Sequence, residues 1–187
     1  TYVNNGEFQL SGIDVALDWG FDVGPGSLNL NVLANYLLQF ESTSLVGLID
    51  SVDYVGTLGT GENGLQGGNY EYRVFTTLGY NWGPAYLGVQ WQHRPAIEDA
   101  TEAQIGAPTP TTGFPSYNLF SLNGSYAVTE DLNLRFGVDN LLNEAPPIGG
   151  VNVNADPSLG QLAGGGYNSQ FYDTNGRRFY LGANIRF

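Results

Sequence analysis

The sequence predicts an all-β protein: an antiparallel, up-and-down sheet that is a segment of a transmembrane β-barrel. Apolar and polar residues alternate along long segments, most clearly at the end of the chain, where Phe179, Leu181, Ala183, Ile185 and Phe187 share one side. This period of two is expected of a strand whose two faces meet different media. The predicted strands have ten to fifteen residues, against about 5–6 in soluble sheets and about 9–11 in membrane strands. Short and long connections alternate between them.

The first predicted hairpin comprises strands 7–21 and 27–41, joined by the tight turn Asp22-Val-Gly-Pro-Gly26. Apolar residues alternate from Ile13 to Phe21 and again from Leu28 to Phe40. Phe8 and Leu10 are out of phase with Ile13 and the residues that follow it. An extra residue in one strand corrects such a shift, so we expect a β-bulge near Ser11-Gly12.

Five more strands follow, at 69–81, 85–96, 117–128, 132–141 and 176–187. Trp82-Gly-Pro84 and Thr129-Glu-Asp131 form tight turns, whereas 42–68, 97–116 and 142–175 are long segments rich in Gly, Pro, Asn, Asp and Thr. Short turns on one side and long loops on the other are typical of outer-membrane barrels. Three irregular loops of this length are unusual in a compact soluble domain.

One face of these strands carries no charged residue, which favours contact with lipid, because an Arg near the middle of the bilayer costs about 2–4 kcal/mol. The other face is polar, and we expect it to line the barrel interior. The charged residues expected to face this lumen, as contacts for a plug or a substrate path, are Arg73, Arg94, Arg135, Asp139, Arg178 and Arg186, with Glu71 among the further polar residues. The strand expected to close the barrel presents Phe179, Leu181, Ile185 and Phe187 to lipid.

Aromatic residues gather near both ends of the predicted strands, as in the interfacial girdles of membrane barrels. Trp19, Phe21, Tyr80, Tyr126 and Phe187 lie toward the short turns, and Phe8, Phe40, Tyr70, Tyr72, Trp91, Phe120 and Phe179 lie toward the long loops. The alternative interpretation is that aromatic residues are simply good strand formers.

Composition excludes several classes of protein. The formal net charge is −12, which argues against nucleic acid as a partner, because its binding needs a basic surface. The chain has no Cys, so it has neither disulfides nor thiolate metal ligands. Seven strands are an odd number, and an antiparallel meander of odd number cannot close on itself. We therefore expect residues 1–187 to be the C-terminal part of a larger barrel domain.

Two segments resemble the C-terminal end of TonB-dependent outer-membrane receptors. They are NLRFGVDNLLNEAPP (133–147) and YDTNGRRFYLGANIRF (172–187), with Gly137, Val138, Asn140 and Leu141 in the first and Gly176, Arg177 and Phe187 in the second. The resemblance implies a barrel of about 22 strands with a plugged lumen. It also implies an N-terminal plug and a segment that meets a periplasmic energy-coupling protein, neither of which is present in this chain.

Few residues suggest chemistry, and we expect no catalytic, cofactor or metal site and no enzymatic activity. GTGENG (59–64) fits a dinucleotide motif formally, but a strand rather than a helix is expected after it, so we interpret it as a loop. His93 is the only histidine and falls on the Trp91 face, as an interfacial polar residue. Four loop aromatics offer rings that could stack on a sugar or an aromatic chelator, and none of them is favoured over the others: Tyr54, Phe114, Tyr117 and Tyr167.

The loops are strongly acidic. Their carboxylates are Asp50, Asp53, Glu62, Glu98, Asp99, Glu102, Glu144, Asp156 and Asp173. One interpretation is that these loops attract cations. The other is that their charge only keeps the protein soluble and repels other acidic surfaces.

The expected function is uptake of a scarce nutrient, such as a siderophore, cobalamin or a carbohydrate, across the outer membrane of a Gram-negative bacterium. The expected partners are outer-membrane lipid, the remainder of the receptor, the energy-coupling protein and a small-molecule ligand. A passive porin or adhesin is the main alternative, and a barrel hydrolase using His93 is a further one. A soluble β-sandwich, with the apolar face as its core, is the third.

Overall fold

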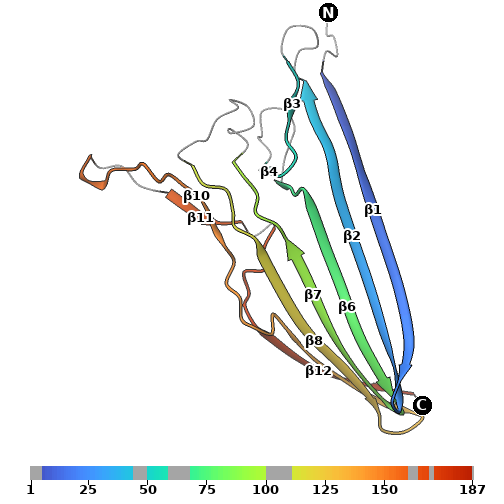
Figure 1. Ribbon diagram of the computed structural model, residues 1–187. Coiled ribbons are helices and arrows are strands. Elements are labelled where there is room, and N and C mark those ends of the chain that lie inside the picture. Colours follow the sequence, from blue (N-terminus) through green and yellow to red (C-terminus); the bar gives the residue numbers. More distant parts are fainter. Residues whose placement is uncertain are drawn as a thin grey trace, which may run out of the picture.

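One antiparallel sheet dominates the computed structural model, which describes residues 6–43, 50–58, 68–99, 111–159, 164–168 and 171–186 (Figure 1). Seven long strands follow one another in sequence order across it, each paired with the next. They are β1 (Glu7–Val23), β2 (Gly26–Thr43), β6 (Tyr72–Trp82), β7 (Ala85–Arg94), β8 (Tyr117–Ala127), β9 (Leu132–Asp139) and β12 (Arg178–Ile185). The prediction of an all-β, up-and-down antiparallel sheet is confirmed.

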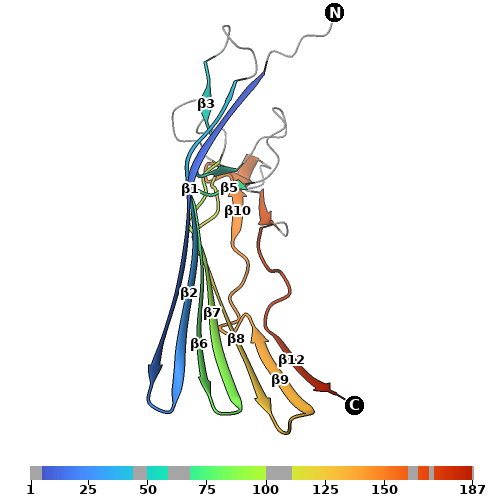
Figure 2. The same ribbon diagram turned by 90° about the vertical axis from the view of Figure 1, so that its right-hand side faces the viewer.

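The short elements lie in the long connections. β3 (Val52–Asp53) pairs with the end of β2, β4 (Thr57–Leu58) pairs with β5 (Gly68–Asn69), and β10 (Ile148–Val151) pairs with β11 (Gly164–Tyr167). A single 3₁₀ turn, η2, covers Pro157–Leu159 within the described residues. These elements gather at one end of the sheet and the tight turns lie at the other, as predicted (Figure 2). Within the described residues, no helix has the length and apolar character needed to cross a membrane.

Two of the three tight turns use the same Gly-Pro pair. Gly24 and Gly83 have φ angles of 58° and 54°, and Pro25 and Pro84 follow them. A glycine with positive φ at the first central position is the mark of a type II′ hairpin turn, whose twist matches that of the strands. The proline occupies the second central position of each turn. Its ring fixes its own φ angle there, and it has no N–H to donate.

The register confirms the predicted bulge. Ser11 pairs with Gln39 and Gly12 with Leu37, so Leu38 has no partner on β1. The extra residue of the bulge thus lies on β2, and Leu10 pairs with Phe40 beyond it. A side chain at Gly12 would also meet the Tyr36 carbonyl oxygen at 2.8 Å, which explains the glycine at the bulge.

The apolar residues of all seven strands form one continuous face. Registered rows cross the sheet, as in Leu30, Leu78, Val89, Leu122 and Val138, which are joined pair by pair. No second layer covers this face among the described residues, and Leu181 is 80% exposed. The chain exposes 11936 Å², whereas a compact protein of 20.2 kDa exposes about 8,800 Å². A β-sandwich would bury these side chains, so the described strands do not form one.

The sheet is curved and open (Figure 2). β1 and β12 are its two edges, and each pairs with one long strand only within the described residues. Because seven strands alternate in direction, the edge strands run the same way, as the odd number predicts. Phe187, one of the residues expected to close a barrel, lies outside the described residues.

Two expected positions were wrong. Tyr70 was expected in the aromatic girdle on the long-loop side and Glu71 on the polar face, but β6 begins only at Tyr72, after a bend at Glu71. Tyr70 is buried in a cluster beneath the loops. The Glu71 carboxylate accepts a 2.7 Å hydrogen bond from the hydroxyl of Tyr36, a residue of the apolar face. The bend reverses the alternation, which a strict period of two did not reveal.

Candidate functional site: the polar face of the sheet

The polar face carries the residues expected to line a lumen. The register places Arg73 opposite Asn35, Arg135 opposite Ser125, and Asp139 opposite Arg178. Arg94 follows His93 in β7, and since His93 belongs to the apolar face, Arg94 belongs to the polar face. Arg186 follows β12, and its backbone N–H donates to the Asp131 carbonyl oxygen at 2.9 Å.

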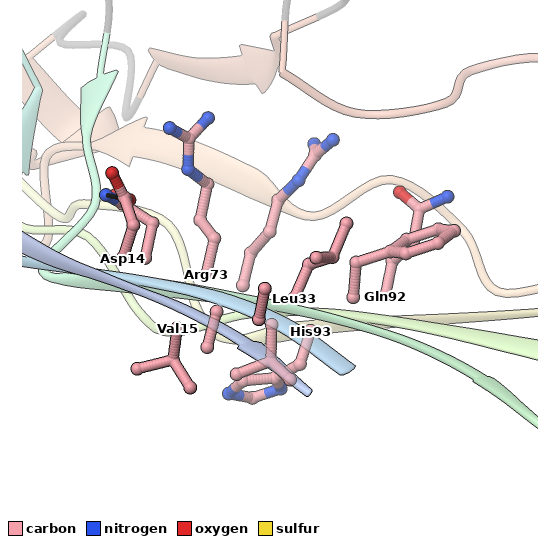
Figure 3. A pocket seen from close by; sticks show the side chains of 12 residues that line it. Asp14, Val15, Leu33, Arg73, Gln92 and His93 are labelled. Atoms are coloured by element: carbon pink, nitrogen blue, oxygen red, sulfur yellow. Dashed lines mark hydrogen bonds between the residues drawn. The ribbon is translucent and has the colours of Figure 1, made fainter. Parts of the chain in front are cut away.

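Arg73 and Arg94 border a hollow of about 470 Å³. Asp14, Arg73, Leu33 and Gln92 project from one side of the sheet there, whereas Val15 and His93 project from the other (Figure 3). The polar face is not uniformly polar. Leu33 stands between Ala16 and Phe75 in register, so an apolar row crosses this face next to the arginines.

Two carboxylates of β1, Asp14 and Asp18, are bonded to amides of β2. Asn35 donates to Asp14 at 2.7 Å, and Asn31 donates to Asp18 at 2.6 Å. Each pair lies directly across the two strands. These aspartates are therefore held by the neighbouring strand.

Of the arginines expected to face a lumen, Arg178 is the one with carboxylate partners in the described part of the chain. Its guanidinium lies 3.0 Å from Asp173 and 3.6 Å from Asp139. Arg73 and Arg135 are exposed and contact no carboxylate among the described residues. Sequence alternation found the face of these residues but not which of them are paired.

An aromatic cluster fastens the long connections to the loop end of the polar face. Its buried members are Tyr70, Ile97, Phe114, Tyr117 and Tyr172. Tyr70 donates a 3.0 Å hydrogen bond to the Tyr172 hydroxyl, and burial, followed by this bond, raises the pKa of Tyr172 above its usual value. The Arg94 guanidinium lies 5.8 Å from the centre of the Tyr172 ring, within the range of a cation–π contact.

Burial removes three of the four loop aromatics as candidates for stacking on a ligand. Tyr54, Phe114 and Tyr117 are buried, and only Tyr167 of the four is exposed, at 61%. The Tyr117 hydroxyl is buried without a hydrogen-bond partner in the described structure. Their place beside the strand ends was visible in the sequence, but the folding of distant loops onto them was not.

The two segments that carry the family resemblance meet in the structure. Asn140 is fully buried, has a φ of 53°, and bonds both backbone groups of Glu144, donating to its oxygen at 2.8 Å and accepting from its nitrogen at 2.7 Å. The Asn143 side-chain oxygen accepts from the Arg177 N–H at 3.1 Å. The Asn143–Arg177 bond and the Arg178–Asp139 pair hold the entry of β12 against the end of β9.

His93 belongs to the apolar face, as predicted. Asn118 Oδ1 accepts from Trp91 Nε1 at 3.0 Å and lies 2.8 Å from His93 Nδ1, which therefore donates. His93 Nε2 is 3.3 Å from the Tyr72 hydroxyl. Both ring nitrogens are thus engaged with an amide and a phenol, and not with a serine.

Comparison with protein-family models, with curated proteins and with solved structures finds no match to this chain.

Proposed function

We propose that this chain is the C-terminal part of the wall of an outer-membrane β-barrel. In this proposal the whole protein is a TonB-dependent receptor that imports a scarce nutrient, such as a siderophore, cobalamin or a carbohydrate, into a Gram-negative bacterium. The observation that carries it is the exposed, uncharged face that runs across all seven long strands. Monomeric soluble proteins rarely expose a continuous apolar surface of this extent. Lipid is the partner that an apolar face of this kind requires.

The dimensions of the face support a membrane location. The eleven residues of β6 rise about 33 Å along the strand. At the usual tilt of about 40°, this corresponds to a height of about 25 Å, which is the height of the apolar band of outer-membrane barrels.

Two aromatic belts border this band. On the loop side, ring contacts connect Tyr36 to Tyr72, Tyr72 to His93, His93 to Trp91, and Trp91 to Phe120. On the turn side, Tyr80 contacts Trp82 at 5.5 Å, and its hydroxyl donates to the Val23 carbonyl oxygen at 2.7 Å. Rings with bonded polar tips suit the boundary between lipid and water.

The open edges support a larger barrel. β1 has 17 residues, all of them exposed, and its outer edge has no partner among the described strands. Unpaired backbone groups are costly in lipid, where only a closed barrel satisfies them. We therefore propose that further strands complete the ring and enclose the polar face.

The assignment to TonB-dependent receptors is supported by the resemblance of 133–147 and 172–187, two segments joined by the Asn143–Arg177 bond and the Arg178–Asp139 pair. The wall itself makes or breaks no bond in this proposal. Its polar face contacts the plug and shapes the path of the ligand, and the energy-coupling protein acts through the N-terminal region.

The membrane assignment is tested with spin labels. Because the chain has no Cys, Leu78→Cys and Thr77→Cys give single labels on opposite faces of β6. In lipid vesicles, we expect the label at position 78 to collide with oxygen dissolved in lipid and the label at 77 with a water-soluble nickel complex. Equal exposure of both labels to the nickel complex contradicts the proposal.

The transport mechanism is tested on the whole receptor. A plugged receptor leaves a planar bilayer nearly non-conducting, and an uncoupler of the inner membrane abolishes uptake in cells. Steady ionic conductance with uptake that survives the uncoupler supports the passive porin instead.

A further inference from the structure

The polar face holds two neighbouring arginines whose positive charges are not balanced by a carboxylate in contact with them among the described residues. Val74 pairs with His93, and the residues next to this pair, Arg73 on β6 and Arg94 on β7, line the same hollow. Like charges in this arrangement are destabilising. Neither guanidinium contacts a carboxylate in the described structure.

The nearest carboxylate on the same face does not relieve this repulsion. Asp14 is in register with Asn35, and Asn35 with Arg73, so Asn35 stands between them. Two strand spacings, about 10 Å, therefore separate the backbones of Asp14 and Arg73. Asp14 already accepts from Asn35 at 2.7 Å.

We propose that Arg73 and Arg94 form a binding site for the carboxylate of an organic acid with an aromatic or other apolar body. Arg94 lies over the Tyr172 ring at 5.8 Å, within the range of a cation–π contact, and guanidinium groups bind carboxylates through two parallel hydrogen bonds. The apolar row of Leu33 and Phe75 lies in the same hollow and supplies a surface for the body of the ligand.

The site also agrees with the charge of the whole chain. The formal net charge is −12, so an anion is repelled almost everywhere else, and two adjacent cations give one place where it is attracted. The role of the site in uptake rests on the proposed function, but binding at the site does not.

Benzoate is the probe, with benzamide as its uncharged analogue and inorganic phosphate as an anion without an apolar body. The full chain is folded in detergent micelles and titrated calorimetrically. We expect benzoate to bind more tightly than either control. We expect Arg73→Gln and Arg94→Gln each to weaken it about 10-fold or more, as loss of a charge-assisted hydrogen bond implies.

Arg135→Gln is the matched control, because it removes the same charge from the same face at a separate position. A change of less than about 2-fold is expected there, since charges separated by more than about 8–10 Å are largely screened at physiological salt. If all three substitutions weaken benzoate binding equally, the affinity comes from the overall charge of the polar face, and the proposed site is wrong. Equal binding of benzoate and benzamide also overturns it.

Phe75→Ala tests the apolar part of the site. We expect it to weaken benzoate and to leave phosphate binding unchanged. If both ligands bind equally well to the wild type and to this variant, the site accepts any anion and the organic-acid assignment is wrong. The spin-label experiment reports independently on membrane insertion, so failure of this inference and failure of the proposed function are distinguishable.

Discussion

Asn140 shows how one side chain fixes the loop that follows a strand. It is the only fully buried polar side chain in the described core, and it adopts a left-handed backbone conformation with a φ of 53°. Asparagine tolerates this conformation better than most residues, because its short amide bonds to the local backbone. Here the amide bonds both backbone groups of Glu144, so the loop after β9 is held without a strand partner.

Replacing Asn140 separates these two contributions. Asn140→Ala is expected to destabilise the protein by about 3 kcal/mol, from two lost hydrogen bonds and a strained backbone. Asn140→Gly should cost about 1 kcal/mol less, since glycine accepts positive φ. Urea unfolding in lipid vesicles measures both values. Equal costs for the two variants contradict the role of the backbone conformation.

The aromatic cluster gives a second prediction at the residue scale. Tyr117→Phe removes a buried hydroxyl that has no partner in the described structure and should stabilise the protein by about 1 kcal/mol. Tyr172→Phe, in the same cluster, removes the group that accepts the bond from Tyr70 and should destabilise by about 1 kcal/mol. Thermal unfolding followed by near-ultraviolet circular dichroism distinguishes opposite shifts from parallel ones.

At the scale of single elements, the period of two and the Gly-Pro pairs were sufficient to predict all seven long strands. The bulge at Ser11-Gly12 was also predictable, since the phase of the apolar residues changes there. The bend at Glu71 was not, because it leaves the alternation of residue types intact while reversing the direction of the side chains. The strand β10 and its partner β11 were missed because glycine occupies most of their positions.

The turns allow a prediction about the backbone alone. A Cβ at Gly83 would meet no atom within 4 Å, so the positive φ of 54° is its only restriction. Gly83→Ala should therefore cost about 1–2 kcal/mol. Gly182 is equally free of neighbours but has no positive φ, so Gly182→Ala should be nearly neutral. Urea unfolding in vesicles compares the pair, and equal losses would contradict the type II′ assignment.

The two faces of β6 allow a prediction about the membrane. Leu78→Arg places a charge on the apolar face and is expected to cost about 2–4 kcal/mol if the residue lies near the middle of the bilayer. Thr77→Arg places the same charge on the polar face, beside Asn31, and should be tolerated. The yield of folded protein in vesicles measures this difference, and a similar loss in both variants contradicts the assignment of the faces.

At the scale of the whole molecule, the seven long strands form a single layer that no second layer covers in the part that the structure describes. The buried clusters involve the long connections and the loop ends of the strands. The polar and apolar faces of the sheet were predictable from alternation, because each long strand repeats the same pattern. Pairing on the polar face was not: Arg178 reaches Asp173 in a distant connection, whereas Arg73 finds no carboxylate among the described residues. Sequence spacing carries no information about how the long connections return to the sheet.

A single-layered sheet of this kind should need detergent or lipid to stay in solution. We expect the purified chain to stay monodisperse in detergent and to aggregate when the detergent is removed, because long exposed edge strands and an uncovered apolar face both favour association. Analytical ultracentrifugation follows the transition. A monomer in plain buffer would instead support a soluble domain.

The first hairpin is much longer than the others: β1 and β2 have 17 and 18 residues, whereas β6 and β7 have 11 and 10. The excess lies at the loop end, beyond the level of Tyr72, and rises above the neighbouring strands (Figure 1). In the proposed orientation, the loop end of this hairpin extends farther from the cell surface than the neighbouring strands do. Of the residues that the structure describes in the seven long strands, 7–11 and 39–43 would then be the first that antibodies and bacteriophages approaching the cell meet.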